Sequence, residues 1–497
     1  GLTVVDDKTF TVELVDADAD FPLQLAYPAF FPLPTVAYEN TLGYNEAPIG
    51  QGPFMFPEGG SWDHDTAIDL VINPDYAGDN VPSIEGINFI ITTDPKVDYL
   101  ETLDGNIDVL TNIDVDFRPQ APTDFPDRWA TSPNTGILYM GIPAYLDIFT
   151  VEQRQALSMA VDRDLLIEKI FGNGAPARSV IPPNLGGRDD VCASWNYDPE
   201  AAKALWDSAP APEGFAVWFN QGGGHEEWIE AVVNMWGTTL GMDTSTVTFE
   251  TREWADYLPL LDNAEVTGPF RLGWGMDYPS PLNFLEPLYA SYNTAPEGGS
   301  NATYYNNPEF DAAIAAGKEA VAAEGVVEAG LPDYFAGEDL LCNDVPVIPI
   351  RFSENQFVWN EGTADVYMDA YGNVDYTVIT AEDGFVSQDL TEPQSLFPMD
   401  ANESEGTQVL MRNLFTGLTG IDKDGGQFLG NAESITSDDG GTTWTVVLKD
   451  GWNFHNGEAV TAASYVDAWS FGARAELGFQ NNSFYKNMVG YDEMNAG

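Results

Sequence analysis

The stretch QALSMAVDRDLLIEKIFGNGAPARSVIPP, residues 155–183, decides the fold of this chain. Its first part, Gln155–Phe171, predicts a helix. Two more helices are predicted, at Glu226–Leu240 and at Pro308–Ala323. Asn307 can cap the last of these, and the proline that follows it suits a first helical position. Two of the three predicted helices therefore follow this stretch in the sequence.

Short strands are predicted between and around these helices. Thr9–Val15 and Trp444–Leu448 alternate apolar and polar residues with period two, which is typical of half-buried strands. Ala67–Ile72 and Ile87–Thr92 are also predicted strands. Strands and helices alternate without an internal repeat, and no segment has the length or composition of a flexible linker. This order predicts a mixed α/β protein of interleaved lobes.

The chain has 497 residues, with 19 Lys+Arg against 79 Asp+Glu, and a formal net charge of −60. A nucleic-acid partner is excluded, because such binders need a basic surface. Docking on an anionic membrane through basic residues is excluded for the same reason. Hydrophobic residues make up 44% and aromatic residues 12%, so the chain can bury a large core. At roughly 150 residues per domain, two to four lobes are expected.

The acidic charge has two interpretations. It can be a solvated coat that keeps an exported or salt-adapted protein in solution, or an acidic cleft that attracts cations. The coat is favoured, because the acids are spread along the chain and form no single block. Screening of the coat should make the protein more stable as salt rises.

Catalytic motifs are absent from the sequence. GxSxG, GxGxxG and GxxxxGK[ST] do not occur, and none of the three histidines belongs to an HExxH motif. The run Asp16–Asp20 begins like an EF-hand but lacks the glycine and glutamate that such a loop requires. We therefore predict no enzyme activity, no metal site and no cofactor.

Many segments resemble the extracellular solute-binding proteins of peptide and nickel ABC importers, the oligopeptide- and dipeptide-binding family. Residues 448–461, LKDGWNFHNGEAVT, are similar to that family's signature LRxGVKFHDGxPVT, and residues 155–183 follow its pattern along their whole length. The other similar segments are NLFTG (413–417), residues 432–444, APIGQGPF (47–54), NPDYAG (73–78), DGNIDV (104–109), WNYDP (195–199), GWGMDYPSPLNFLE (273–286), YYNNPEF (304–310) and VPVIPI (345–350). Together they cover nearly the whole chain.

The order of these segments departs from the family. Family members begin with the segment found here at about 384–497 and end with the segment found at about 345–380. We therefore expect a circular permutation, or a chain whose parts were rejoined. A window cut from a tandem array would have the same order.

The resemblance implies a periplasmic-binding-protein-like fold (type II, cluster C) of α/β class, with two hinged lobes, an additional small domain, and circular permutation. Lobe I is expected at 47–165 plus 361–421, the small domain at 422–497 plus 1–46, and the other lobe at 166–360. Cys192 and Cys342 both fall in that last lobe. In an exported protein the pair is expected to form one disulfide, the alternative being two separate buried thiols.

The resemblance also implies the function. It indicates a monomeric receptor that captures di- or oligopeptides between its lobes and delivers them to the membrane permease of an ABC importer. The protein is then extracellular or periplasmic, and the native precursor is expected to carry a lipid anchor that this chain lacks. No run of 18 apolar residues predicts a membrane span.

In peptide binders of the family, the acid that receives the ligand's α-ammonium lies in a WxADY segment. The matching residues here begin at Trp274, so Asp277 is the leading ligand contact and Trp274 and Tyr278 are expected to shape the pocket. The structural alternatives are a turn-capping aspartate and two core aromatic residues. Arg252 and Arg271 are candidates for a bidentate pair with a peptide carboxylate, although a salt bridge to one of the many acids is the simpler expectation for each.

Other functions remain open from the sequence. The same fold could bind an oligosaccharide stacked on some of the 13 tryptophans, a nickel complex or an opine. A hydrolase that uses two carboxylates is a less favoured alternative. An engineered scaffold or sensor, in which permutation moves the chain ends, is a third class.

Overall fold

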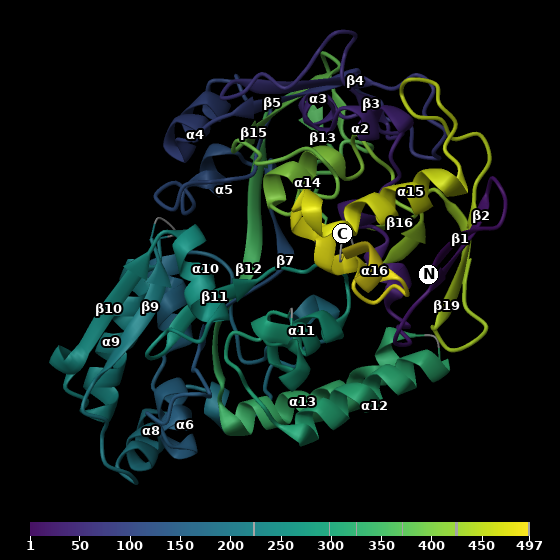
Figure 1. The fold of residues 1–497 in the computed structure, drawn as a ribbon. Coiled ribbons are helices and arrows are strands. Elements are labelled where there is room, and N and C mark those ends of the chain that lie inside the picture. The colour runs from purple at the N-terminus through teal and green to yellow at the C-terminus, as the bar shows by residue number, and fades with distance from the viewer. Residues whose placement is uncertain (222–223, 298, 325, 370, 423–425, 496–497) are drawn as a thin grey trace. The chain divides into compact units, whose positions relative to one another are not determined.

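The computed structural model describes residues 1–221, 224–297, 299–324, 326–369, 371–422 and 426–495. The chain forms two compact units. Unit 1 comprises residues 1–132 and 355–497, and unit 2 comprises residues 133–354. Two long strands, β7 (Trp129–Gly141) and β12 (Val347–Trp359), contain the boundaries between the units (Figure 1).

Unit 2 is built on a sheet with the strand order β10-β9-β11-β7-β12. The strands β9, β10 and β11 are parallel, and β11 pairs antiparallel with β7. Their bounds are Phe215–Asn220 for β9, Val247–Arg252 for β10 and Phe270–Trp274 for β11. The helices of this unit include α6 (Val151–Met159), α8 (Pro199–Trp206), α9 (Glu226–Leu240), α10 (Trp254–Asp262), α12 (Pro308–Glu324) and α13 (Leu331–Asp344).

The helix α9 has the bounds that the sequence predicts. Its apolar face buries Trp228, Val232 and Trp236 in a core shared with α6, α8 and strands of the sheet. The indole Nε1 of Trp236 donates to the carbonyl of Leu157 at 2.9 Å, so this large side chain is both packed and hydrogen-bonded. Gly241 ends the helix at a φ of 70°, a left-handed position that glycine adopts without strain.

The single helix predicted over Gln155–Phe171 is wrong. The structure ends α6 at Met159, begins α7 (Arg163–Leu166) after Asp162, and continues in a π-helical turn (Ile167–Phe171). The Asp162 carboxylate accepts from the Leu165 amide at 3.0 Å and caps the new helix. The buried Arg163 guanidinium donates to carbonyls at the end of α6 and to the carbonyl of Pro349 at 2.6 Å. These bonds replace the helical ones that the break removes.

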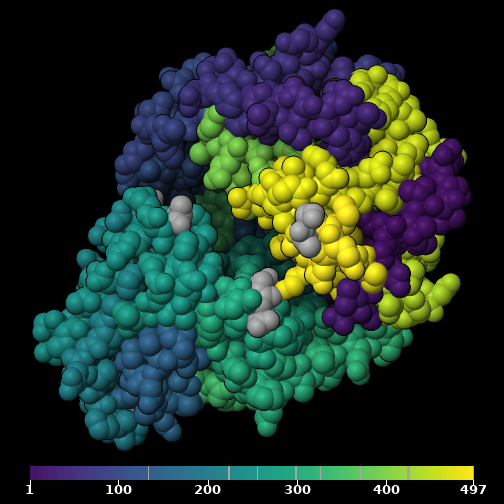
Figure 2. Space-filling model, viewed as in Figure 1, coloured from purple at the N-terminus to yellow at the C-terminus, as the bar shows by residue number. Residues whose placement is uncertain are grey.

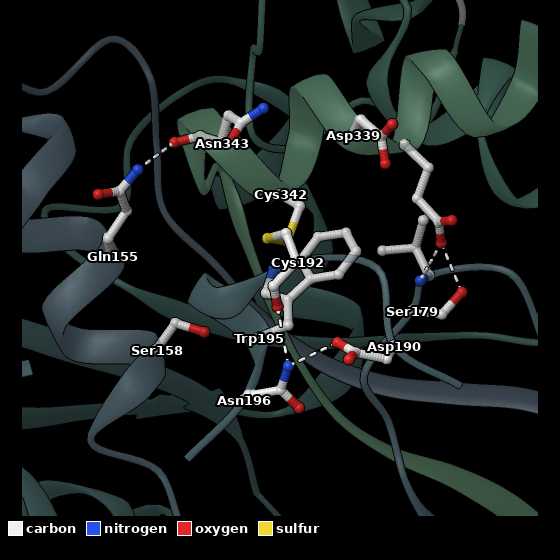
Figure 3. Close-up of a disulfide and its surroundings, with 12 residues drawn as sticks. Gln155, Ser158, Ser179, Asp190, Cys192, Trp195, Asn196, Asp339, Cys342 and Asn343 are labelled. Carbon is white, nitrogen blue, oxygen red and sulfur yellow. Dashed lines mark hydrogen bonds between the residues drawn. A yellow bond between two sulfur atoms is a disulfide. The ribbon is translucent and has the colours of Figure 1, made fainter. Parts of the chain in front are cut away.

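A disulfide joins Cys192 to Cys342, 150 residues further along the chain (Figure 3). Their Cα atoms are 6.2 Å apart. Cys342 lies fully buried in α13, and Cys192 precedes a 3₁₀ turn that contains the buried Trp195. The Trp195 indole donates to the carbonyl of Val347 at 3.2 Å, so the cross-link sits in an ordered part of unit 2.

Unit 1 has a main sheet with the strand order β12-β6-β15-β5-β4-β3. The predicted strands are present as β4 (Ala67–Ile72) and β5 (Gly86–Ile91), and β15 runs parallel to β5. The remaining strands of this sheet are β3 (Phe54–Met55), β6 (Val109–Leu110) and β15 (Phe385–Leu390), and the longer helices of the unit are α4 (Pro95–Leu103), α14 (Ser404–Leu410) and α15 (Ala462–Gly472).

A second sheet of unit 1 combines residues from both parts of the chain. Its order is β1-β2-β19-β18, and all of its pairs are antiparallel. The strands are β1 (Leu2–Val4), β2 (Thr9–Glu13), β18 (Ala432–Thr436) and β19 (Thr443–Leu448). The Glu13 carbonyl also accepts from the Val489 amide at 2.9 Å, and the first and last segments lie side by side on the surface in Figure 2.

The acidic charge predicts a strong dependence of stability on salt. Even if each Lys and Arg paired with one acid, 79 − 19 = 60 carboxylates would have no such cation. Raising the ionic strength from about 0.1 to about 1 M shortens the screening length from about 10 to about 3 Å and weakens their mutual repulsion. We expect the thermal unfolding midpoint to rise by several degrees over this range in a calorimetric scan. An unchanged midpoint would contradict a repulsive coat.

Candidate functional site

The candidate residues gather at one edge of the unit 2 sheet. The parallel strands β9, β10 and β11 end at Asn220, Arg252 and Trp274. Because parallel strands end at the same edge, these residues share it, and the segment that follows β11 carries Asp277 there as well. This carboxyl edge of a parallel sheet is where open α/β sheets usually bind ligands.

Asn283 connects two of the predicted residues. Its Oδ1 accepts from the Trp274 indole Nε1 at 3.2 Å and from the Asp277 backbone amide at 3.0 Å. Its Nδ2 donates to the Asp277 carboxylate at 3.1 Å. Because the Asn283 side chain is itself buried, the aspartate and the indole are held in fixed positions. Asn283 was not predicted as a site residue from the sequence, although it lies inside the family-like segment 273–286.

The Asp277 carboxyl group is electrostatically unusual. Its side chain is half-buried, and the surrounding protein raises its pKa to about 6, a shift that the hydrogen bond from Asn283 partly opposes. Desolvation favours the neutral form of an acid, so burial makes ionisation of this carboxyl group costly. A cationic ligand group placed beside the carboxylate would lower that cost.

Arg271 lies on β11, six residues before Asp277. Its Nη1 donates to Asn220 Oδ1 at 3.0 Å, while its Nε is buried without a hydrogen-bond partner. None of the ion pairs of the described residues includes this arginine. Burial lowers the pKa of the guanidinium, which shows that its charge is poorly solvated. The predicted salt bridge to an acid is therefore absent from the described part of the chain.

Arg252 ends the neighbouring strand and is more exposed. Its Cα is paired in register with that of Asn220, the partner of Arg271. Its guanidinium lies 5.3 Å from the centre of the Trp218 ring and 3.4 Å from the Glu250 carboxylate. The salt bridge expected as the simpler alternative is thus present, in addition to a cation–π contact.

His225 adds a titratable group beside α9. The Trp228 indole donates to its Nδ1 at 3.3 Å. Burial, together with Arg271 and Arg351, lowers its pKa to about 4, so the imidazole is neutral at neutral pH. In the sequence, the histidines were tested only as members of a metal-binding motif, so His225 was not predicted as a site residue. The remaining predicted residue, Tyr278, is half-buried directly after Asp277.

The described residues contain no group of three or more His, Cys, Asp or Glu side chains suited to a metal ion. In the same residues, no helix has the length and apolar character needed to cross a membrane. Among the described residues, this edge brings together the half-buried Asp277, the Arg271 guanidinium, which joins no described ion pair, and aromatic side chains. Such groups can bind a ligand by charge and hydrogen bonds.

Residues 1–296 match the family described as bacterial extracellular solute-binding proteins, family 5 middle. Among curated proteins, the heme-binding protein A of Haemophilus influenzae is 28% identical over 373 residues, which are 70% of this chain and 64% of that protein. The periplasmic oligopeptide-binding protein OppA of Salmonella typhimurium is 26% identical over 373 residues, 71% of this chain and 65% of that protein. The match therefore spans less than two thirds of these relatives.

Solved structures share the fold. HbpA2 from Haemophilus parasuis aligns with a TM-score of 0.63 at 23% sequence identity, covering 77% of this chain and 75% of that chain. The binding protein DppA from Helicobacter pylori, solved with the peptide STSA, aligns with a TM-score of 0.61 at 19% identity, covering 77% and 74%. The predicted two-lobed binding-protein fold class is confirmed by these likenesses.

Proposed function

Because the chain belongs to the bacterial extracellular solute-binding proteins of family 5, we propose that it is a receptor for small peptides. It captures di- or oligopeptides outside the cytoplasmic membrane and delivers them to the permease of an ABC importer. It performs no chemistry on its ligand. The observation that carries the proposal is the half-buried Asp277, which Asn283 holds at the carboxyl edge of the unit 2 sheet.

Asp277 receives the α-ammonium group of the peptide in this proposal. An ammonium group brought out of water needs an anionic partner, and Asn283 holds the Asp277 carboxylate in a fixed position at this edge. The Trp274 indole and the Asp277 backbone amide both donate to Asn283 Oδ1, so the indole is held in a fixed position beside the Asp277 carboxylate. Tyr278 follows directly and lines the same edge.

Arg271 receives a ligand carboxylate in the same proposal. Its Nη1 is oriented by Asn220, and its charge has no acidic partner among the described ion pairs. A guanidinium can bind a carboxylate in a bidentate manner. The exposed Arg252 assists from the next strand. A zwitterionic peptide therefore meets one charge of the correct sign at each end.

Peptide binding should weaken as the pH falls through about 6. The ionised form of Asp277 binds the ammonium group, and protonation of the carboxyl near its pKa of about 6 removes the attraction. One pH unit below the pKa, about one molecule in eleven keeps the charge, so calorimetry should give a roughly tenfold weaker affinity at pH 5 than at pH 7.5. An N-acetylated peptide is the control and should show no such loss.

A ligand panel tests the substrate class. Thermal unfolding should be compared with di- and tripeptides, oligosaccharides and hemin, each in excess. A ligand at 100 times its Kd adds roughly 2.7 kcal/mol to the stability of the native state. Peptides should raise the midpoint and remain intact after long incubation. A rise with sugars alone, or cleavage of the peptide, would contradict the proposal.

We also propose the domain division and the permuted order expected from the sequence. The small domain would comprise 422–497 with 1–46, and the antiparallel sheet β1-β2-β19-β18, which contains strands from both segments, supports joining them. A Cβ atom added to Gly1 would lie 3.1 Å from the Val489 carbonyl, so the two chain segments approach closely. Sequencing the source gene and weighing the intact chain would test the segment order.

A further inference from the structure

A cavity in unit 1 lies apart from the peptide site in sequence and uses none of its residues. Its volume is about 110 Å³. It opens between the hairpin of β16 (Thr419–Ile421) and β17 (Gln427–Leu429) and the segment that follows β19. The cavity is smaller than an enclosed cavity of about 150 Å³ that holds benzene, but it is partly open, so a ring can enter it with one edge exposed.

Aromatic side chains form the walls of the cavity. The rings of Tyr76 and Trp452 meet edge to face, with centroids 5.5 Å apart, and the Tyr76 hydroxyl lies 3.3 Å from the Thr416 hydroxyl. Phe428 is 38% exposed, and its ring lies so close to Gly420 that a Cβ there would be 2.4 Å from it. The absence of a Cβ at Gly420 lets the tip of the Phe428 ring approach the backbone there, and the partly exposed ring gives the cavity an apolar wall.

Among the described residues that line the cavity, three are charged: Asp79, Arg412 and Lys449. Arg412 forms an ion pair with the buried Asp375 and lies 5.8 Å from the centre of the Phe428 ring, so its charge is already compensated. Lys449 donates to the Leu429 carbonyl at 3.2 Å. The described ion pairs of lysine residues do not include it. An ammonium group without a carboxylate partner is notable in a chain of net charge −60.

We propose that this cavity binds a small organic anion with a flat ring, such as an aromatic carboxylate. The ring packs against Phe428, Tyr76 and Trp452, and the carboxylate pairs with Lys449. This site goes beyond the peptide receptor function and stands independently of it. The acid-rich surface repels anions in general, so an anion binds here because the cavity supplies its own cation.

Calorimetric titration of the full chain with phenylacetate tests the proposal, alongside benzylamine and acetate as probes. Phenylacetate should bind with a Kd in the millimolar range or tighter, and acetate should bind at least about tenfold more weakly because it lacks the ring. In the Asp277→Asn variant, which lacks the proposed ammonium site, benzylamine should show no saturable binding. Equal binding of benzylamine would mean that the acidic surface attracts the probes, and would overturn the proposal, as would no binding of phenylacetate.

Matched variants locate the site. Lys449→Gln should weaken phenylacetate binding by about fivefold or more, and Phe428→Ala by about threefold or more. Lys8→Gln removes the same charge from unit 1 at a residue that pairs with Asp450 outside the cavity, and it should change the affinity less than about twofold. Asp277→Asn should leave phenylacetate binding unchanged. Loss of binding in that variant, or an unchanged affinity in both cavity variants, would refute this assignment.

Discussion

An Asp277→Asn variant is expected to bind peptides with a free α-ammonium group roughly 30-fold or more weakly than the unaltered chain. Removing one partner of a hydrogen-bonded charge pair in a desolvated site costs about 2–5 kcal/mol, and 2 kcal/mol corresponds to roughly 30-fold in Kd. Asparagine has nearly the same shape and can still accept from Asn283. The loss therefore reports the charge, and calorimetry at pH 7.5 measures it.

The same variant should unfold at a higher temperature. The folded-state pKa of Asp277 is raised to about 6 above its ordinary value of 3.8, so the native state loses stability as the pH rises through this range. A neutral side chain removes that cost at neutral pH. Asp256→Asn changes an exposed acid of unit 2 and is the control, with unchanged affinity. An unaltered affinity in Asp277→Asn would remove this residue from the binding site.

Breaking the Cys192–Cys342 disulfide is expected to lower the free energy of unfolding by roughly 4–5 kcal/mol. The bond closes a loop of 150 residues, and the chain-entropy model assigns a cost of this size to losing such a constraint on the unfolded state. A Cys192→Ser, Cys342→Ala double variant avoids placing a hydroxyl at the fully buried position. Denaturant unfolding of both proteins measures the difference.

A double-mutant cycle separates the cross-link from packing. Each single variant also breaks the bond, so each should lose nearly the full amount, and the double variant should lose little more. The unaltered protein, denatured without reductant, should contain no free thiol that reacts with a colorimetric reagent. Two titratable thiols, or additive losses in the cycle, would contradict a stabilising bond.

Helices whose ends depend on residues nearby in the sequence could be predicted from local sequence patterns. The apolar face and the terminal glycine of α9 give its bounds, and Asn307 with Pro308 marks the start of α12. The break after Met159 could not be predicted in this way. It depends on the buried Arg163, which donates to the carbonyl of Pro349, a residue distant in sequence.

The candidate site was predicted in part. The family resemblance pointed to Asp277 and Trp274, and the scarcity of cations pointed to Arg271. The structure brings all three to one sheet edge, with Asn283 and Asn220 as hydrogen-bond partners. The sequence contains no signal for the raised pKa of Asp277, since burial in the folded protein causes it. Likewise, only tertiary structure places Arg271 and Arg351 close enough to lower the pKa of His225.

The antiparallel sheet β1-β2-β19-β18 of unit 1 has a consequence for folding during synthesis. β2 pairs with β19, which begins more than 400 residues later, so this sheet closes only after both of these distant segments have been translated. Unit 2 is one continuous segment, 133–354, and it can fold while synthesis continues. Until β19 is made, the edge of β2 that it pairs with stays open, and an open strand edge can pair with other chains and aggregate.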